Sequence, residues 1–257
     1  MIELKSDEYG KILPLIKDIT HSRGIVYSIV EGNTDGKIFV DDYENPKTAF
    51  IEWEFSYLIG FDSNENFNNS VYNYIFNEKI QKSEVKELVL FIFSGNWDGI
   101  KKLLKEKGCI EIRRKMFNFN YDIYQKNKLE KINITDDFKV VEIGEDFINN
   151  YQKHKDILKS PSRFGFSIVN EFEIVSECIC VAVGSKEAEI SIETNEKYRN
   201  KGYATKICNI FIDYCISNNI VPNWSCWPFR IESINLAHKL GFQDKEEIPA
   251  MYWSENM

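Results

Sequence analysis

The second half of the chain alternates short apolar runs of strand length with segments of helical period, and this order limits the fold more than any other feature. From residue 138 onward the pattern predicts the order β-α-β-β-β-α-β-α-β-β. Strands joined by tight turns pair antiparallel, whereas strand–helix–strand units pair parallel. We therefore predict an α+β (mixed α/β) fold with a mixed, mostly antiparallel sheet covered by helices.

The first half shows a related order. A short amphipathic helix over 7–21 is predicted first, with Pro14 in its first turn. The strand-like runs that follow share an apolar character and lie at 24–30, 37–41, 48–53, 55–60, 87–93 and 109–120. The turn cluster at 32–36 predicts a hairpin between the first two runs. Since the order echoes the second half, we expect a degenerate second copy of the same fold.

A polar stretch from Tyr121 to Thr135 has few large apolar residues and predicts the domain boundary. We expect residues 1–130 to form a first domain that lines the substrate site or is structural, and residues 135–257 to form the active domain.

The amino-acid composition excludes several classes of function. The 32 basic and 40 acidic residues give a net charge of −8, which disfavours nucleic-acid binding and suits cationic partners such as amines. No apolar run approaches the ~20 residues of a membrane span, and no basic segment precedes an apolar stretch at the N-terminus. We expect a cytoplasmic protein. Six cysteines without C-x-x-C spacing and three scattered histidines predict no metal site, and the cysteines are expected to be reduced and buried.

The segment Arg199-x-x-Gly202-x-Ala204 lies between a predicted strand and a predicted helix. Amide groups at a helix start lack intrahelical acceptors, and the helix dipole adds positive potential there. Gly202 and Ala204 lack bulk, so a pyrophosphate can approach the main chain, and Arg199 and Lys201 add charge. The alternative is a turn that uses glycine only for its shape.

Three sequence motifs, taken together, resemble those of a known protein family. Residues 190–194 are followed by the Arg-x-x-Gly-x-Ala loop and then by 233–242, which reads Ser-x-x-Leu-Ala-x-Lys-Leu-Gly-Phe. Residues 135–257 thereby resemble the GCN5-related N-acetyltransferase (GNAT) family. Words that resemble a narrower branch, which includes the zwittermicin A resistance acetyltransferase, are Ser176-Glu177-Cys178, 189–194, Asp41-Asp42 and 45–49.

The resemblance implies a GNAT-fold C-terminal domain, preceded by a degenerate GNAT-like domain, that transfers acetyl from acetyl-CoA to a primary amine of a small molecule. The antibiotic, amino-sugar and polyamine classes stay open, as do a monomer and a homodimer. The main chain of Ile192 and Thr194 corresponds to the family's pantetheine site. The residues that correspond to its pyrophosphate loop are Arg199, Asn200, Lys201, Gly202, Tyr203, Ala204 and Thr205.

Two strand carboxylates are the candidate general bases. Glu189 and Glu193 are four residues apart, so period-two alternation predicts that they share a face. A strand carboxylate takes the amine's proton in some family members. The alternative for each is a solvated or salt-bridged glutamate.

The sequence departs from the family at the usual general acid, a tyrosine that is here Ala237. His238, Tyr203, Tyr214, Tyr252 and water are unranked substitutes. A CoA-binding sensor without chemistry, a protein acetyltransferase, another acyl chain and an O-linked acceptor therefore remain alternatives. The aromatic residues Trp224, Trp227 and Phe229 are either a cofactor wall or core.

The first half has no equivalent phosphate loop. Its corresponding segment, 61–67, contains two acids and no glycine, so we expect no CoA binding there. Asp41, Asp42, Glu52 and Glu54 are either acidic contacts to a substrate or a solvated face.

Overall fold

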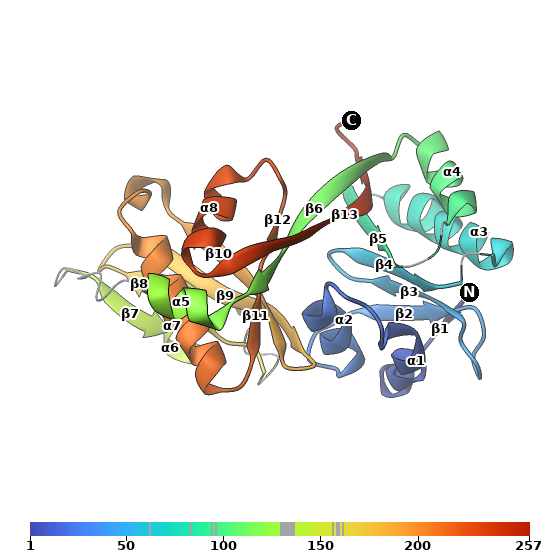
Figure 1. Cartoon of the computed structure of the whole chain (residues 1–257). Coiled ribbons are helices and arrows are strands. Elements are labelled where there is room, and N and C mark those ends of the chain that lie inside the picture. The colour runs from blue at the N-terminus through green and yellow to red at the C-terminus, as the bar shows by residue number, and fades with distance from the viewer. Residues whose placement is uncertain are drawn as a thin grey trace. The chain divides into compact units, whose positions relative to one another are not determined.

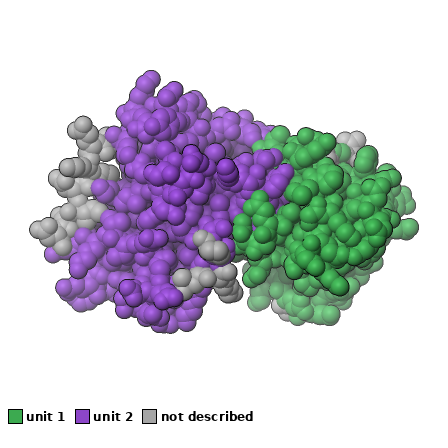
Figure 2. Space-filling view, turned by 90° about the horizontal axis from the view of Figure 1, so that it is seen from below, with its two compact units in different colours: residues 1–21, 29–114, 247–257 green, residues 22–28, 115–246 purple. Residues whose placement is uncertain are grey.

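The structure is a computed structural model that describes residues 1–61, 63–82, 84–93, 95, 97–128, 137–155, 157, 160 and 162–257. The chain divides into two compact units (Figure 2). Unit 1 contains Met1–His21, Ile29–Arg114 and Glu247–Met257, and unit 2 contains Ser22–Ser28 and Lys115–Glu246. These limits differ from the predicted ones, because the chain's end returns to unit 1. Most of the predicted boundary, 129–136, lies outside the described residues.

Unit 1 combines a sheet with two neighbouring helices, α3 and α4 (Figure 1). Its elements are β1 (Ile2–Glu3), a 3-10 helix (Ser6–Ile12), α1 (Leu13–Ile16), β2 (Lys37–Val40), β3 (Thr48–Glu52), β4 (Ser56–Gly60), α3 (Glu65–Asn73), a π-helix (Tyr74–Ile80), β5 (Glu87–Ile92), α4 (Asp98–Glu106), the start of β6 (Ile110–Phe119) and the end of β13 (Phe242–Ser254). Strands β2, β3 and β4 pair antiparallel, and β5 pairs parallel with β4. The core contains Phe50, Leu90 and Trp97.

Unit 2 follows the same plan. Its elements are most of α2 (Arg23–Val30), the end of β6, α5 (Tyr121–Asn127), β7 (Lys139–Glu142), α6 (Glu145–Tyr151), β8 (Gly165–Val169), β9 (Ile174–Gly184), β10 (Glu187–Thr194), α7 (Tyr203–Ser217), β11 (Val221–Asn223), β12 (Ser225–Cys226), α8 (Ile231–Lys239) and the start of β13. Strands β7 to β10 pair antiparallel in succession, and β11 pairs parallel with β10. Helix α7 packs on β8 and β9 through a core that includes Cys178, Cys208 and Phe211.

Both units therefore share one motif: three antiparallel strands, a helix, and a fourth strand parallel to the third. This confirms the mixed α/β class and the predicted echo between the halves. The strand order β1-β2-β3-β4-β5-β13-β6-β12 of the larger sheet shows that the C-terminal strand β13 lies between β5 and β6. The predicted final strand pair is thus wrong, since 242–254 forms a single strand.

The predicted strand over 24–30 is also wrong, because these residues form helix α2. A short, fully apolar, β-branched run does not distinguish a buried helix from a buried strand. Two glycines of unit 2 let α2 pack closely: a Cβ on Gly24 would lie 2.8 Å from the Glu187 carbonyl oxygen, and one on Gly184 would lie 2.1 Å from the Ser28 nitrogen. The predicted hairpin with 37–41 is accordingly absent, and β2 instead pairs with β1 and β3.

Helix α6 ends at Tyr151, and Gln152 follows it in the left-handed conformation. Within the part of the chain that the structure describes, no helix is long and apolar enough to cross a membrane.

Candidate active site

The N-terminus of α7 has the geometry of an anion site. Gly202 precedes the helix with φ +86°, and Asn200 has φ +62°, so the loop turns sharply into the first helical residue, Tyr203. No side chain caps this end. The amides of Tyr203, Ala204 and Thr205 therefore lack intrahelical acceptors, and the helix dipole favours negative charge beside them. Gly202 suits this position because a positive φ costs it little.

The two loop cations take different places. Arg199 donates from Nε to the Thr194 carbonyl oxygen over 3.3 Å and pairs with Glu196 at 3.4 Å. The ammonium of Lys201 lies 5.3 Å from the centre of the Tyr198 ring. Arg199 thus ties the loop to the end of β10, while its side chain stays largely exposed.

Among the residues that the structure describes, no strand pairs with one edge of β10 beyond Glu189. Its pairing with β11 covers only residues 187–189, and the β9–β10 register shifts between Glu189 and Ile190, as at a β-bulge. Beyond this point, the Glu193 carbonyl accepts from Ser176 Oγ and the Asn195 amide donates to the Val175 carbonyl, so these odd-numbered residues face β9.

Main-chain groups alternate in direction along a strand. Ile192 and Thr194 therefore direct theirs to the opposite edge, away from β9 and towards the side from which β11 has diverged. Their predicted role is a main-chain role, and this edge is where such a role is possible.

Ala188 belongs to the core under α7, and Ile190 and Ile192 pack against that core, so Glu189 and Glu193 share the opposite face of β10, in agreement with the alternation prediction. The register shift leaves residue 181 of β9 unpaired and keeps the period of two along β10. The two side chains still differ in exposure, since Glu189 is buried while the Glu193 side chain is 71% exposed. Glu189 accepts from Asn223 Nδ2 at 3.3 Å, and Asn223 also donates to Glu187. Glu189 thus joins the β10–β11 pairing, whereas Glu193 lines a cavity of about 350 Å³.

Two charged residues that the sequence analysis did not select as site residues, Glu177 and Lys153, line that cavity, and His154 contacts Glu177. Glu177 of β9 is 5% exposed, and its carboxylate accepts from Lys153 and lies 2.8 Å from His154 Nε2. The Lys153 ammonium also lies 3.1 Å from Glu193 Oε2. A glutamate within the apolar run 174–183 was the available signal, since an isolated acid in such a strand needs partners when buried.

The pKa values of this cluster are shifted by competing effects. Burial raises the pKa of Glu177, but hydrogen bonds from His154 and Lys153 outweigh it, so the pKa is lowered overall. Burial lowers the pKa of Lys153, but the hydrogen bonds to Glu177 and Glu193 outweigh this effect, so the pKa of Lys153 is raised overall. Both groups are therefore held in their charged forms.

A stability prediction follows from Glu177. The pKa of Glu177 is lower in the folded state than its ordinary value of 4.5, so the ionised carboxylate stabilises the native state at any pH above 4.5. This stabilisation is lost as the pH falls through the folded-state pKa. We expect Glu177→Gln to reduce the free energy of unfolding by about 1–3 kcal/mol at neutral pH. The deficit should shrink in acid. Urea unfolding at a series of pH values measures it, and a pH-independent deficit would contradict this account.

The substitutes for the general acid are dispersed. Ala237 is fully buried, and His238 Nε2 lies 2.7 Å from Asp244 Oδ1. Tyr214 packs against Phe164, and Tyr203 against Phe138. Tyr252 belongs to unit 1. None of these contacts singles out one hydroxyl as an acid.

The predicted aromatic cluster separates in the structure. Trp224 is buried in the core and donates to Ser233 Oγ at 3.1 Å, whereas Phe229 is 72% exposed. None of the six cysteines forms a disulfide, and all six are buried, as small apolar residues would be. Among the residues that the structure describes, no group of three or more His, Cys, Asp or Glu is arranged to hold a metal ion.

The corresponding helix of unit 1, α3, has a capped N-terminus. Asn64 caps it by accepting from the Phe67 amide at 3.0 Å, and the Asn64 Nδ2 lies 3.3 Å from Asp41 Oδ2. Asp41 in turn accepts from the Lys47 and Thr48 amides at 3.0 Å each. Asp62, one of the two acids of the predicted segment, lies outside the described residues.

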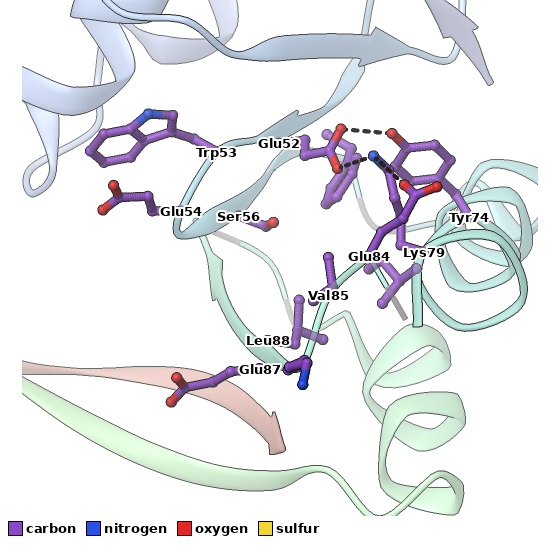
Figure 3. A pocket seen from close by; sticks show the side chains of 13 residues that line it. Glu52, Trp53, Glu54, Ser56, Tyr74, Lys79, Glu84, Val85, Glu87 and Leu88 are labelled. Atoms are coloured by element: carbon purple, nitrogen blue, oxygen red, sulfur yellow. Dashed lines mark hydrogen bonds and ion pairs between the residues drawn. The ribbon is translucent and has the colours of Figure 1, made fainter. Parts of the chain in front are cut away.

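Two further acids of unit 1 differ in their surroundings. In a cavity of about 280 Å³, Glu52 accepts from Tyr74 at 2.6 Å and pairs with Lys79 at 3.1 Å, and Lys79 reaches Glu84 at 3.4 Å (Figure 3). Glu54 is exposed at the wall of the same cavity. Asp42 accepts from two amides of the following turn.

Comparison with known proteins gives a match to one protein family. A family model described as GNAT acetyltransferase matches residues 14–251. A protein of Bacillus subtilis (strain 168) named "Uncharacterized N-acetyltransferase YdfB" is 29% identical over 262 residues, which cover 97% of each chain.

Two solved structures share the fold over nearly the whole chain. A GCN5-related N-acetyltransferase-like protein from Streptococcus suis 89/1591 has a TM-score of 0.69 and 20% identity, over 96% of this chain and 99% of its own. A tandem GNAT protein from the clavulanic acid biosynthesis pathway has a TM-score of 0.61 and 8% identity, over 98% and 97%.

Proposed function

Since the chain belongs to the GNAT acetyltransferase family, we propose that it transfers the acetyl group of acetyl-CoA directly to a primary amine of a small molecule of the antibiotic, amino-sugar or polyamine class. The observation that carries the proposal is the uncapped N-terminus of α7, with Gly202 at positive φ, next to the open edge of β10. Both features lie in unit 2 and fit a cofactor with a diphosphate and an extended arm.

Different parts of the chain bind the diphosphate and the arm of the cofactor. The amides of 202–205, with Lys201 nearby, hold the diphosphate of acetyl-CoA, and the main chain of Ile192 and Thr194 holds its arm. The bound cofactor supplies an acetyl thioester. Main-chain N–H groups at the β10 edge stabilise the negative charge that develops on the thioester oxygen. Arg199 keeps the loop attached to Thr194.

Glu193 removes the proton of the attacking amine. Of the two candidate carboxylates, it is the one that lines the cavity, and its largely exposed side chain can reorient towards an acceptor. A base is required because only the neutral amine is a nucleophile. Because Ala237 replaces the tyrosine usual in the family, water protonates the leaving thiolate.

The test is release of free CoA thiol from acetyl-CoA with a panel of amines that includes diamines, amino sugars and an amine-bearing peptide. We expect release with at least one small amine and none with the peptide. If the protein binds acetyl-CoA tightly but no amine releases thiol, the CoA-binding sensor is the better interpretation.

The N-termini of α3 and α7 differ, and this difference predicts how many acetyl-CoA molecules one chain binds. Unit 1 has Asn64 and Asp41 at the helix end where unit 2 has open amides, and a carboxylate there repels phosphate. We therefore expect one acetyl-CoA per chain in isothermal titration calorimetry, and two equal sites per chain would contradict the assignment. Unit 1 is proposed to be structural or to line the substrate site.

Three further properties are part of the proposal. The words that resemble the zwittermicin A resistance branch favour an antibiotic-like amine. The six cysteines, none of which forms a disulfide, support a cytoplasmic location, where thiols stay reduced. We propose a monomer or homodimer that binds neither nucleic acid nor membranes.

A further inference from the structure

The cavity beside Glu193 already contains an amine, the ammonium of Lys153. This nitrogen contacts two carboxylates at once, Glu177 on β9 and Glu193 on β10. The two strands pair with Glu177 directly opposite Glu193, so the carboxylates converge on one point. A primary ammonium is thus seated where two negative charges meet, next to the strand edge assigned to the acetyl group.

The remaining charges of the cavity do not neutralise this pair. Glu196 and Arg199 also line the cavity, but they pair with each other. His154 contacts Glu177 alone among these acids. Within the described part of the chain, Lys153 is therefore the cation that Glu177 and Glu193 share, and without it two carboxylates would face each other with one of them almost fully buried.

The anchoring of Lys153 is uneven. Its backbone lies beyond the end of α6, between Gln152 and His154, which have φ values of +54° and +61°. Such conformations are unfavourable for residues other than glycine and persist only when other contacts hold them. Its side chain is 41% exposed, and its Glu193 partner is more exposed still. An external ammonium can therefore exchange with Lys153 from the solvent side, in a cavity of about 350 Å³.

We propose that the acceptor's ammonium binds between Glu177 and Glu193, in the place that the Lys153 ammonium occupies, so that Lys153 is an internal competitor of the substrate. This rests on the proposed function and extends it. The acceptors it selects are alkylamines that are protonated at neutral pH, and neutral arylamines gain nothing from the two carboxylates. Glu193 then contacts the nitrogen that it deprotonates, and Glu177 is a specificity-determining residue.

The experiment compares benzylamine, a cation at neutral pH, with aniline, a neutral amine of similar shape. Binding is measured by calorimetry without acetyl-CoA in the wild type and in Lys153→Ala. We expect Lys153→Ala to bind benzylamine at least about tenfold more tightly, because benzylamine then no longer has to displace the Lys153 ammonium. The free energy of a hydrogen bond between oppositely charged groups corresponds to at least this factor in affinity. Aniline binding should not change. The acetylation KM for benzylamine should fall in parallel, with kcat little altered.

Controls separate this effect from general charge changes. Lys197→Ala removes an ammonium that pairs with Glu173 outside the cavity, and it should leave benzylamine binding unchanged. Adding Glu177→Gln to Lys153→Ala should reverse the gain. Lys153→Gln, which keeps a polar side chain, should show the same direction of change if Lys153→Ala folds poorly.

The outcomes are distinguishable from those of the proposed function. Equal benzylamine affinity in wild type and both Lys153 variants overturns this inference, whatever the activity. An equal gain for aniline also overturns it, since the gain would then reflect space and not charge. If no amine releases thiol from acetyl-CoA, the proposed function fails while the binding result still decides the cation site.

Discussion

Gly202→Glu is expected to lower the affinity for acetyl-CoA at least about a hundredfold, because two effects act together. The new carboxylate would lie at the uncapped start of α7, where it competes with the diphosphate for the same amides and repels it. The φ of +86° is also unfavourable for any residue with a Cβ, so the loop would shift. Calorimetric titration with acetyl-CoA measures the change.

Two other glycines provide matched controls. Gly108 follows α4 with φ +88° and has open space where a Cβ would lie, so Gly108→Glu carries the same backbone cost in unit 1. Gly144 precedes α6 in unit 2, also with open space, so Gly144→Glu adds the same charge to the same unit. Both should keep wild-type affinity. An unchanged affinity in Gly202→Glu itself would remove the diphosphate site from α7.

Glu193→Gln is expected to lower kcat about a hundredfold at neutral pH, the usual contribution of a general base. Glutamine keeps the size of the side chain and removes its ability to accept a proton. The deficit should be concentrated below about pH 8 and diminish in alkali, because more of the acceptor amine is then already neutral. A pH profile of kcat with one small amine in both proteins is the measurement.

The controls for this substitution lie on β7 and on β10 itself. Glu142→Gln changes an exposed strand glutamate of unit 2 outside the cavity and should leave the rate unchanged. Glu189→Gln tests the second candidate: because Glu189 is buried against Asn223, we expect it to alter stability more than the pH profile. If Glu193→Gln shows the wild-type profile and Glu189→Gln does not, the roles are exchanged.

Much of the architecture was predictable from local pattern. The strands at 37–40, 48–52 and 87–92 lie close to their predicted ranges, and the helix predicted after the 199–204 segment is present as α7. Apolar period and glycine position are local properties, as at Gly202, which precedes α7 in the left-handed conformation. The errors arose where local composition was ambiguous, as in α2, or where the partner was remote, as for β13.

The candidate site divides in the same way. The loop from Arg199 to Thr205 was predicted from its glycine spacing together with the family resemblance, and the structure places a helix start there with Gly202 at a positive φ. The shared face of Glu189 and Glu193 was also predicted, but their difference in burial was not, because it depends on contacts with remote residues such as Asn223 of β11.

By itself, the sequence therefore determined the order of elements, the echo between the halves and the position of the helix start that suits an anion, since each depends on residues close together in the chain. Only the tertiary structure decided that Glu189 is buried and Glu193 is not, that β13 returns to unit 1, and that Lys153 and His154 meet Glu177. Those features depend on pairings between residues far apart in the chain, and their energies come from burial and charge that exist only once the strands are assembled.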